Sequence, residues 1–139
     1  MKPSLLLLLA ATVVLVARPA LAAPPLDEKS FQKLMKEAGD IAKRLKGNQE
    51  EKNAAQMAQD ATRLADIYQE TAPFWKARKV EDAAKWSAES ETSARAAAAA
   101  AKAGDWVKVK TDFGATMKHC KDCHEAHREK LDDGSYRIK

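Results

Sequence analysis

Residues 105–132 read DWVKVKTDFGATMKHCKDCHEAHREKLD, and side chains that favour the interior recur in this segment at helical spacing. The recurring positions are separated by 3, 4, 4, 3, 4 and 3 residues. They are Trp106, Val109, Phe113, Met117, Cys120, His124 and His127. The spacing predicts a helix over residues 106–132. Its core-facing stripe runs from aromatic residues into a group of cysteines and histidines, so we expect that group to face the interior.

The rest of the chain repeats the same period and contains no strand pattern. Further helices are predicted over residues 27–46, 49–71 and 81–103. The stretch between the second and third of these helices is expected to be the longest connection. Four helices of similar length with mostly short links predict an all-α fold, an up-down-up-down antiparallel four-helix bundle.

Capping and breaking residues support these boundaries. Asp27 is placed to cap the first helix and Asp105 to cap the last. Gly47 and Gly104 are suitable stops for the first and third helices, because glycine readily adopts the left-handed conformation that ends many helices. Pro73 is expected to end the second helix.

The first residues, MKPSLLLLLAATVVLVARPALA (1–22), have the three parts of a secretory signal peptide. A lysine opens the stretch, a short apolar run follows, and small residues occupy the −3 and −1 positions before a cleavage site after Ala22. The alternative is a retained membrane anchor, for which the apolar run is short. We therefore expect residues 1–22 to be a signal peptide, residues 23–139 to be one exported domain, and the location to be a bacterial periplasm.

The charge of the chain is nearly balanced after this cleavage. The whole sequence has 24 lysines and arginines against 20 acidic residues, and removal of residues 1–22 leaves 22 against 20. So small an excess does not indicate nucleic acid or an anionic membrane as a partner. No second acid–base pair accompanies the cysteines and histidines, so we expect a carrier or binding protein with no catalytic residues, and not an enzyme.

All cysteines and histidines of the chain fall within residues 119–127, around the string Cys120-Lys-Asp-Cys123-His124. A Cys-x-x-Cys pair serves as a redox disulfide, in a metal site, or as the attachment point of haem c. The third use needs the following histidine: two sulfurs three residues apart bond the vinyl groups of one porphyrin, and the imidazole binds its iron. No strand precedes the pair, which disfavours a thioredoxin-like redox site. A zinc or copper site of Cys120, Cys123, His124 and His127 remains an alternative.

The string CKDCHEAHR (120–128) near the end of a four-helix pattern resembles the class II c-type cytochromes, the family of cytochrome c-prime. The resemblance covers residues 26–131, and outside this string it is one of pattern more than identity. It implies that residues 23–139 form a haem-binding bundle, that Cys120 and Cys123 bind one haem c covalently, and that His124 is the proximal iron ligand. Family members attach their haem outside the cytoplasm, which agrees with export. His127 stands where the family commonly has an aromatic residue.

The sixth position of the iron then decides the function, because a methionine there favours low-spin electron transfer and an open site favours gas binding. Met35 and His124 each lie eight residues from the predicted end of their helix, or ~12 Å, and those ends are neighbours in an antiparallel bundle. Met57 is expected at another depth and Met117 on the helix of His124, so both are expected to be core. The low-spin branch of the family has a methionine in its first helix, in a setting similar to QKLMKEAG (32–39). Met35 is therefore expected to be the distal iron ligand.

Three hypotheses follow from the sequence. The first is an exported mono-haem cytochrome that transfers electrons with His124/Met35 ligation. The second is a five-coordinate cytochrome c-prime that binds nitric oxide or carbon monoxide, and the third is a haem-free metal-binding bundle. The expected partners are redox proteins and, as in relatives, a second copy of the chain; no nucleic acid and no stable membrane insertion are expected.

The remaining polar residues near the motif have weaker roles. His119 is expected to point toward solvent, and His127 is a candidate for a hydrogen bond to a haem propionate. Arg128, with the nearby lysines, is a candidate for a propionate contact or for steering an acidic redox partner. Three aromatic residues are candidates to pack on the faces or edge of the macrocycle: Tyr68, Phe74 and Trp86.

Overall fold

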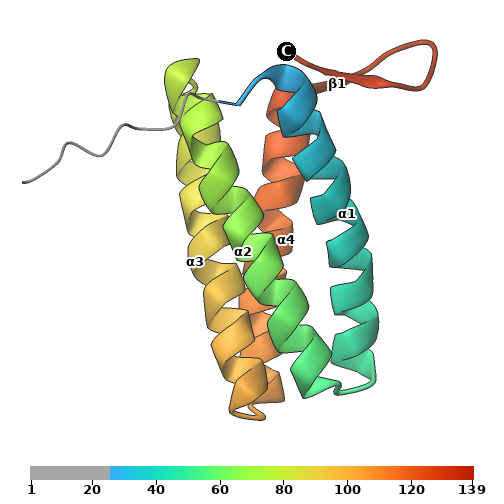
Figure 1. Ribbon diagram of the computed structural model, residues 1–139, viewed down its shortest axis with the longest axis vertical. Helices are drawn as coiled ribbons and strands as arrows, with labels where there is room; N and C mark the ends of the chain where they lie inside the picture. The colour runs from blue at the N-terminus through green and yellow to red at the C-terminus, as the bar shows by residue number, and fades with distance from the viewer. Residues whose placement is uncertain (1–25) are drawn as a thin grey trace, which may run out of the picture.

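The computed structural model describes residues 26–139, so the predicted signal peptide at residues 1–22 lies outside the described residues. Four sequential helices pack antiparallel as a bundle, which confirms the predicted fold class (Figure 1). They are α1 (Glu28–Glu50), α2 (Ala54–Ala77), α3 (Glu81–Lys102) and α4 (Trp106–His127). No helix within residues 26–139 is both long enough and apolar enough to cross a membrane.

The predicted caps hold at the starts of the first and last helices. Asp27 Oδ1 accepts a hydrogen bond from Ser30 N–H at 2.7 Å, and Asp105 Oδ1 accepts one from Lys108 N–H at 3.0 Å. Gly104 follows α3 with a φ of +73°, the left-handed conformation expected of a helix stop. These local signals fix where α3 ends and α4 begins.

Three predicted boundaries of α1 and α2 are wrong. Helix α1 continues through Gly47 to Glu50, and α2 starts later than expected, after the cap Asn53. Pro73 lies inside α2 and does not end it. Proline removes one backbone hydrogen bond from a helix. The next residues, Phe74 and Trp75, are buried, so packing outweighs that loss and residues 72–77 of the predicted connection are part of the helix.

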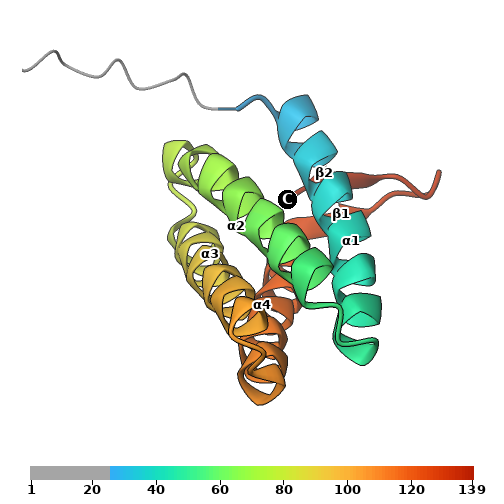
Figure 2. The same cartoon turned by 60° about the horizontal axis from the view of Figure 1, so that its bottom comes forward.

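The end of α4 also differs from the prediction. The helix stops at His127 and the chain forms an antiparallel hairpin of β1 (Arg128–Lys130) and β2 (Tyr136–Ile138). The turn contains Gly134 at a φ of +82° and Asp133, whose carboxylate accepts bonds from the Ser135 amide and hydroxyl. The hairpin lies beside the start of α1, as both ribbon views show (Figures 1 and 2).

The interior is divided into two groups of buried side chains. The main cluster fills most of the bundle with alanines and with larger side chains such as Ile41, Leu45, Leu64 and Phe113. The aromatic cluster, at the end that carries the hairpin, consists of Phe31, Phe74, Trp75 and Ala83. Phe31 stacks on Phe74 with ring centroids 4.1 Å apart.

Helix α1 is joined to the bundle differently from the other helices. Helix α3 packs closely on both α2 and α4, whereas α1 packs on α2 and only sparsely on α4, so α1 stands to one side in Figure 2. Ion pairs add to the α1–α2 contact. Arg63 on α2 donates two hydrogen bonds to Glu37 on α1, and the buried Asp60 on α2 accepts bonds from Arg44 and Asn48.

Candidate haem-attachment site

The two cysteines are free and partly buried, and each packs against a different cluster. Cys120 packs on the main cluster, and Cys123 packs on the aromatic cluster. They lie three residues apart on α4, nearly one helical turn. The pair therefore spans the boundary between the two groups of the interior.

The interior face of α4 contains the predicted stripe except His124, and it is wider than predicted. Val109 and Phe113 are buried as expected, and Met117 and Cys120 are partly buried. Thr116 is also buried, with its hydroxyl 2.7 Å from the Ser93 hydroxyl of α3. Because α4 packs far more on α3 than on α1, its buried face is turned toward α3.

His124 was expected to face the interior of the bundle or its rim. Its side chain is exposed and makes no hydrogen bond within the described residues, so it lies at the rim and not in the interior. The rotation of α4 toward α3 explains the exposure of His124, because it brings Cys123, and not His124, onto the buried face of the helix. The surrounding protein still lowers the pKa of His124, through partial burial of the ring and through the positive charge of Arg128. His124 thus stands as a neutral imidazole at the rim of the bundle.

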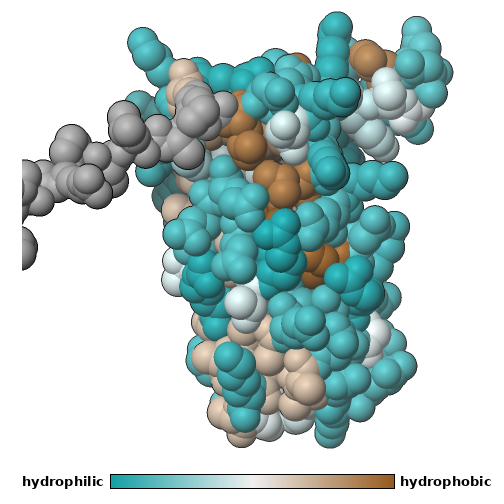
Figure 3. All heavy atoms as spheres, in the orientation of Figure 1, coloured by the Kyte–Doolittle hydropathy of each residue, from teal (hydrophilic) through white to brown (hydrophobic). Residues whose placement is uncertain are grey.

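Met35 lies on α1 opposite this part of α4. Within residues 26–139, Met35 is the one partly buried hydrophobic side chain that packs against both clusters. Cys120 packs on the main cluster and Cys123 on the aromatic cluster, so Met35 shares a cluster with each cysteine. Met57 is fully buried in the main cluster and Met117 is a partly buried neighbour of it, as the core assignments predicted. Hydrophobic side chains reach the surface between α1 and α2 toward the hairpin end of the molecule (Figure 3).

The levels of Met35 and the cysteine motif can be compared through Trp75. Its ring centroid lies 5.1 Å from that of Phe31 on α1 and 5.5 Å from that of His127 on α4. Met35 follows Phe31 by four residues and Cys123 precedes His127 by four, a displacement of ~6 Å along each antiparallel helix. Met35 and Cys123 therefore lie at a similar depth. The predicted depth of the motif was counted from residue 132, whereas α4 ends at His127.

The other two histidines are held by α3. His119 was expected to point toward solvent, and that prediction is wrong: the residue is mostly buried, with Nε2 3.6 Å from Glu89 Oε2. His127 Nε2 lies 3.0 Å from Asp82 Oδ2, and the His127 ring is flanked by Trp75 and Trp86. The His127 contact joins the end of α4 to the start of α3. A propionate bond to His127 stays a prediction, beside this structural role.

Arg128 opens the hairpin with its guanidinium 4.0 Å from the centroid of the Tyr136 ring. The lysines of α4 have neighbours of their own: Lys118 pairs with Asp122 at 2.7 Å and Lys121 with Glu125 at 3.7 Å. The basic residues around the motif are thus interspersed with acidic ones. Steering of an acidic partner and a propionate contact of Arg128 both remain predictions.

Sequence reasoning missed one contact in the site. The Tyr68 hydroxyl of α2 lies 2.7 Å from Cys120 Sγ, and either atom can donate in this hydrogen bond. Tyr68 lies on the apolar stripe of α2, which placed it in the interior but gave no sign that its hydroxyl meets a thiol. The partner could not be named from the sequence because the rotation of α4 depends on its packing against α3.

The donor set fits a covalently attached haem. Two free thiols at Cys-x-x-Cys spacing lie at the boundary of an apolar interior, the following imidazole is neutral, and a thioether lies at a similar depth on the facing helix. The side chains that would form a zinc or copper site, those of Cys120, Cys123, His124 and His127, do not point to one position. Cys120 meets Tyr68, Cys123 enters the aromatic cluster, and His127 meets Asp82. Within residues 26–139, no three His, Cys, Asp or Glu side chains converge on one metal position.

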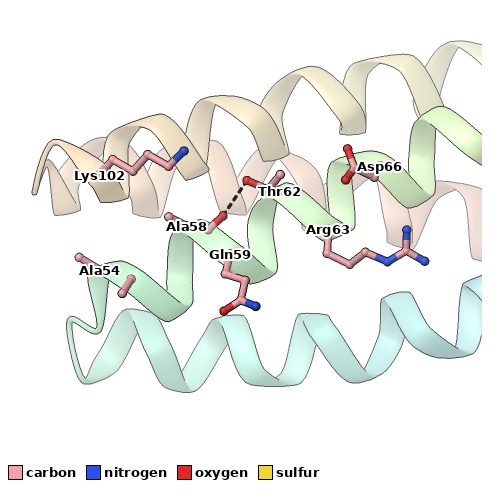
Figure 4. Close-up of a pocket in the computed structure, with 8 residues that line it drawn as sticks. Ala54, Ala58, Gln59, Thr62, Arg63, Asp66 and Lys102 are labelled. Carbon is pink, nitrogen blue, oxygen red and sulfur yellow. Dashed lines mark hydrogen bonds between the residues drawn. The ribbon is translucent and has the colours of Figure 1, made fainter.

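A shallow pocket lies elsewhere, over the first half of α2 and the last turn of α3 (Figure 4). Alanines and the aliphatic parts of polar residues line it, and Lys102, Arg63 and Asp66 stand at its edges. Neither cysteine and no histidine contributes to its walls. The pocket is therefore separate from the cysteine motif.

Comparisons with known proteins gave no match: no family model, no curated protein and no solved structure is significantly similar to the chain. Its four-helix bundle is established by the structure alone.

Proposed function

We propose that the protein is an exported mono-haem c-type cytochrome that acts as a soluble electron-transfer protein. Cys120 and Cys123 would hold haem c through thioether bonds, and His124 and Met35 would bind its iron. The signal peptide expected at residues 1–22 supports a periplasmic location. Redox proteins donate and accept the electron.

The observation that carries this proposal is the position of Met35. Met35 packs against the cluster that holds Cys120 and against the cluster that holds Cys123, so its thioether lies at the boundary that the two cysteines span. It lies on α1, which packs only sparsely on α4, so side chains from both helices face a sparsely packed side of the bundle. This arrangement favours a flat group held between α1 and α4.

The residues of the chain have separate tasks in this proposal. Bound haem supplies a one-electron couple, with a potential that a His/Met ligand pair raises. The two cysteines fix the group to α4, and His124 is ready to bind because its imidazole is neutral at physiological pH. The apolar clusters that Met35 packs against, Phe31 among their members, would limit the access of water to its sulfur.

Met35 also separates electron transfer from gas binding, and an absorption experiment on the haem-loaded protein tests it. We expect the ferric wild type to be low-spin with the weak near-infrared band of sulfur-to-iron charge transfer. Met35→Ala should remove that band, lower the reduction potential and allow rapid carbon monoxide binding.

Met117→Ala and Met57→Ala are the matched controls, since both remove a methionine that packs on the main cluster. They should keep the near-infrared band and lose only packing, on the order of 2–5 kcal/mol for the fully buried Met57. A wild type that is high-spin and binds carbon monoxide without delay rejects Met35 as a ligand. That result favours the five-coordinate gas-binding protein instead.

A further inference from the structure

The hydroxyl of Tyr68 has one hydrogen-bond partner within the described residues, and that partner is a sulfur. Tyr68 is 7% exposed, and its oxygen lies 2.7 Å from Cys120 Sγ. A buried phenol needs a partner, because an unpaired buried hydroxyl is costly. The Tyr68–Cys120 bond therefore holds the Cys120 side chain toward α2.

Cys123 has a different environment. It packs against the aromatic cluster near the start of α3 and makes no side-chain hydrogen bond within residues 26–139. Burial raises the pKa of Cys123 to about 11 and also raises the pKa of Cys120. Both sulfurs are thus neutral thiols near pH 7, and only one of them is held by a polar contact.

A Cys-x-x-Cys pair in an exported protein is open to oxidation before any haem is attached. Closure of a disulfide removes two electrons and two protons from the pair, and a disulfide oxidant such as oxidised glutathione accepts them to become two thiols. The sulfurs must approach to bonding distance, so a contact that holds one of them in another direction opposes closure. Thioether attachment needs both sulfurs to be free.

We propose that Tyr68 is the positioning residue of the cysteine pair: by binding Cys120 Sγ it opposes the Cys120–Cys123 disulfide and keeps both thiols available for haem. The inference rests on the proposed function for its second consequence, the haem loading. Its first consequence, the bias toward the dithiol, concerns the chain alone.

The first test measures the dithiol–disulfide equilibrium of the full haem-free chain in glutathione buffers. The reaction is stopped with acid, free thiols are alkylated, and the two forms are counted by mass. Tyr68→Phe keeps the ring and removes the hydroxyl. Loss of one hydrogen bond should raise the equilibrium constant for the disulfide about fivefold.

Two control variants make the result specific. Tyr136→Phe removes the same atom from a tyrosine that is 45% exposed, and Phe113→Leu loosens the main cluster without a change in any polar group. Neither should shift the equilibrium. The proposal is overturned if Tyr68→Phe behaves like the wild type, or if Phe113→Leu shifts the equilibrium as much.

The second test uses chains produced with haem-maturation machinery and keeps the proposal testable if a haem-free variant fails to fold. Tyr68→Phe should carry haem on a smaller fraction of chains, with the remainder as disulfide, and a small-molecule thiol in the medium should restore loading. A loss that the thiol does not restore, or no loss at all, contradicts the proposal. A wild type without haem refutes the proposed function, while the glutathione equilibrium still decides the role of Tyr68.

Discussion

The side chain of His124 adds little to the packing of the bundle, although His124 is the proposed iron ligand. Its side chain is exposed and has no hydrogen-bond partner within residues 26–139, whereas the neighbouring Cys123 packs on the aromatic cluster. A residue placed for stability is normally buried or paired. The rim position of His124 is instead consistent with a free ligand.

Removal of His124 should therefore separate stability from iron binding. We expect His124→Ala to change the unfolding free energy of the haem-free chain by no more than about 0.5 kcal/mol, as for other exposed positions. The same variant should lose the low-spin spectrum of the haem-loaded protein. Phe113→Ala is the contrasting change, because Phe113 is buried and should lose about 3–5 kcal/mol. Chemical denaturation measures both, and a large loss from His124→Ala shows that the residue is structural.

At the scale of elements, ion pairs add to the attachment of α1 to α2. The hydrogen bonds from Arg63 lower the pKa of Glu37 below its usual value of 4.5. A carboxylate with a lowered pKa contributes stability that is complete above its unfolded pKa and is lost as the pH falls through its folded pKa. Acid should thus weaken the attachment of α1 below about pH 4.5.

Hydrogen exchange at decreasing pH tests this weakening, after correction for the intrinsic pH dependence of exchange. Amides of α1 should lose protection before those of α3, which packs on two helices. In Glu37→Gln the paired charge is absent at every pH, so the extra loss in α1 should disappear. Equal protection loss in α1 and α3 contradicts the account.

Pro73 gives a second prediction for an element. The proline lies inside α2, where it removes the amide that would bond the Gln69 carbonyl, yet Pro73 itself is exposed. Pro73→Ala restores that bond and should raise the unfolding free energy by about 1–3 kcal/mol. Thermal unfolding measures the change. A decrease in stability indicates instead that the proline bends α2 into the position that Phe74 and Trp75 need.

The four-helix bundle could be predicted from the sequence because apolar residues recur at helical spacing in nearly every segment. The caps Asp27 and Asp105 and the stop Gly104 set three boundaries correctly. Pro73 misled because its local cost is smaller than the burial of the residues that follow it.

The hairpin and the orientation of α4 were not predicted for different reasons. The sequence Asp133-Gly134 is typical of a hairpin turn. The last helix was predicted to run to residue 132, however, which left no residues for a first strand. The exposure of His124 and the burial of His119 depend on how α4 turns against α3, which one sequence does not specify. The Tyr68–Cys120 contact follows from the same rotation.

The central claim for the molecule is that Cys120 and Cys123 hold one haem covalently, and the intact mass of the protein tests it most directly. The chain is produced with haem-maturation machinery, denatured, and weighed beside the double variant Cys120→Ala, Cys123→Ala. The account predicts that the wild type has the mass of residues 23–139 plus one haem and that the double variant has the mass of its chain alone. A wild type with no added mass, or a double variant that retains the haem after denaturation, would contradict it.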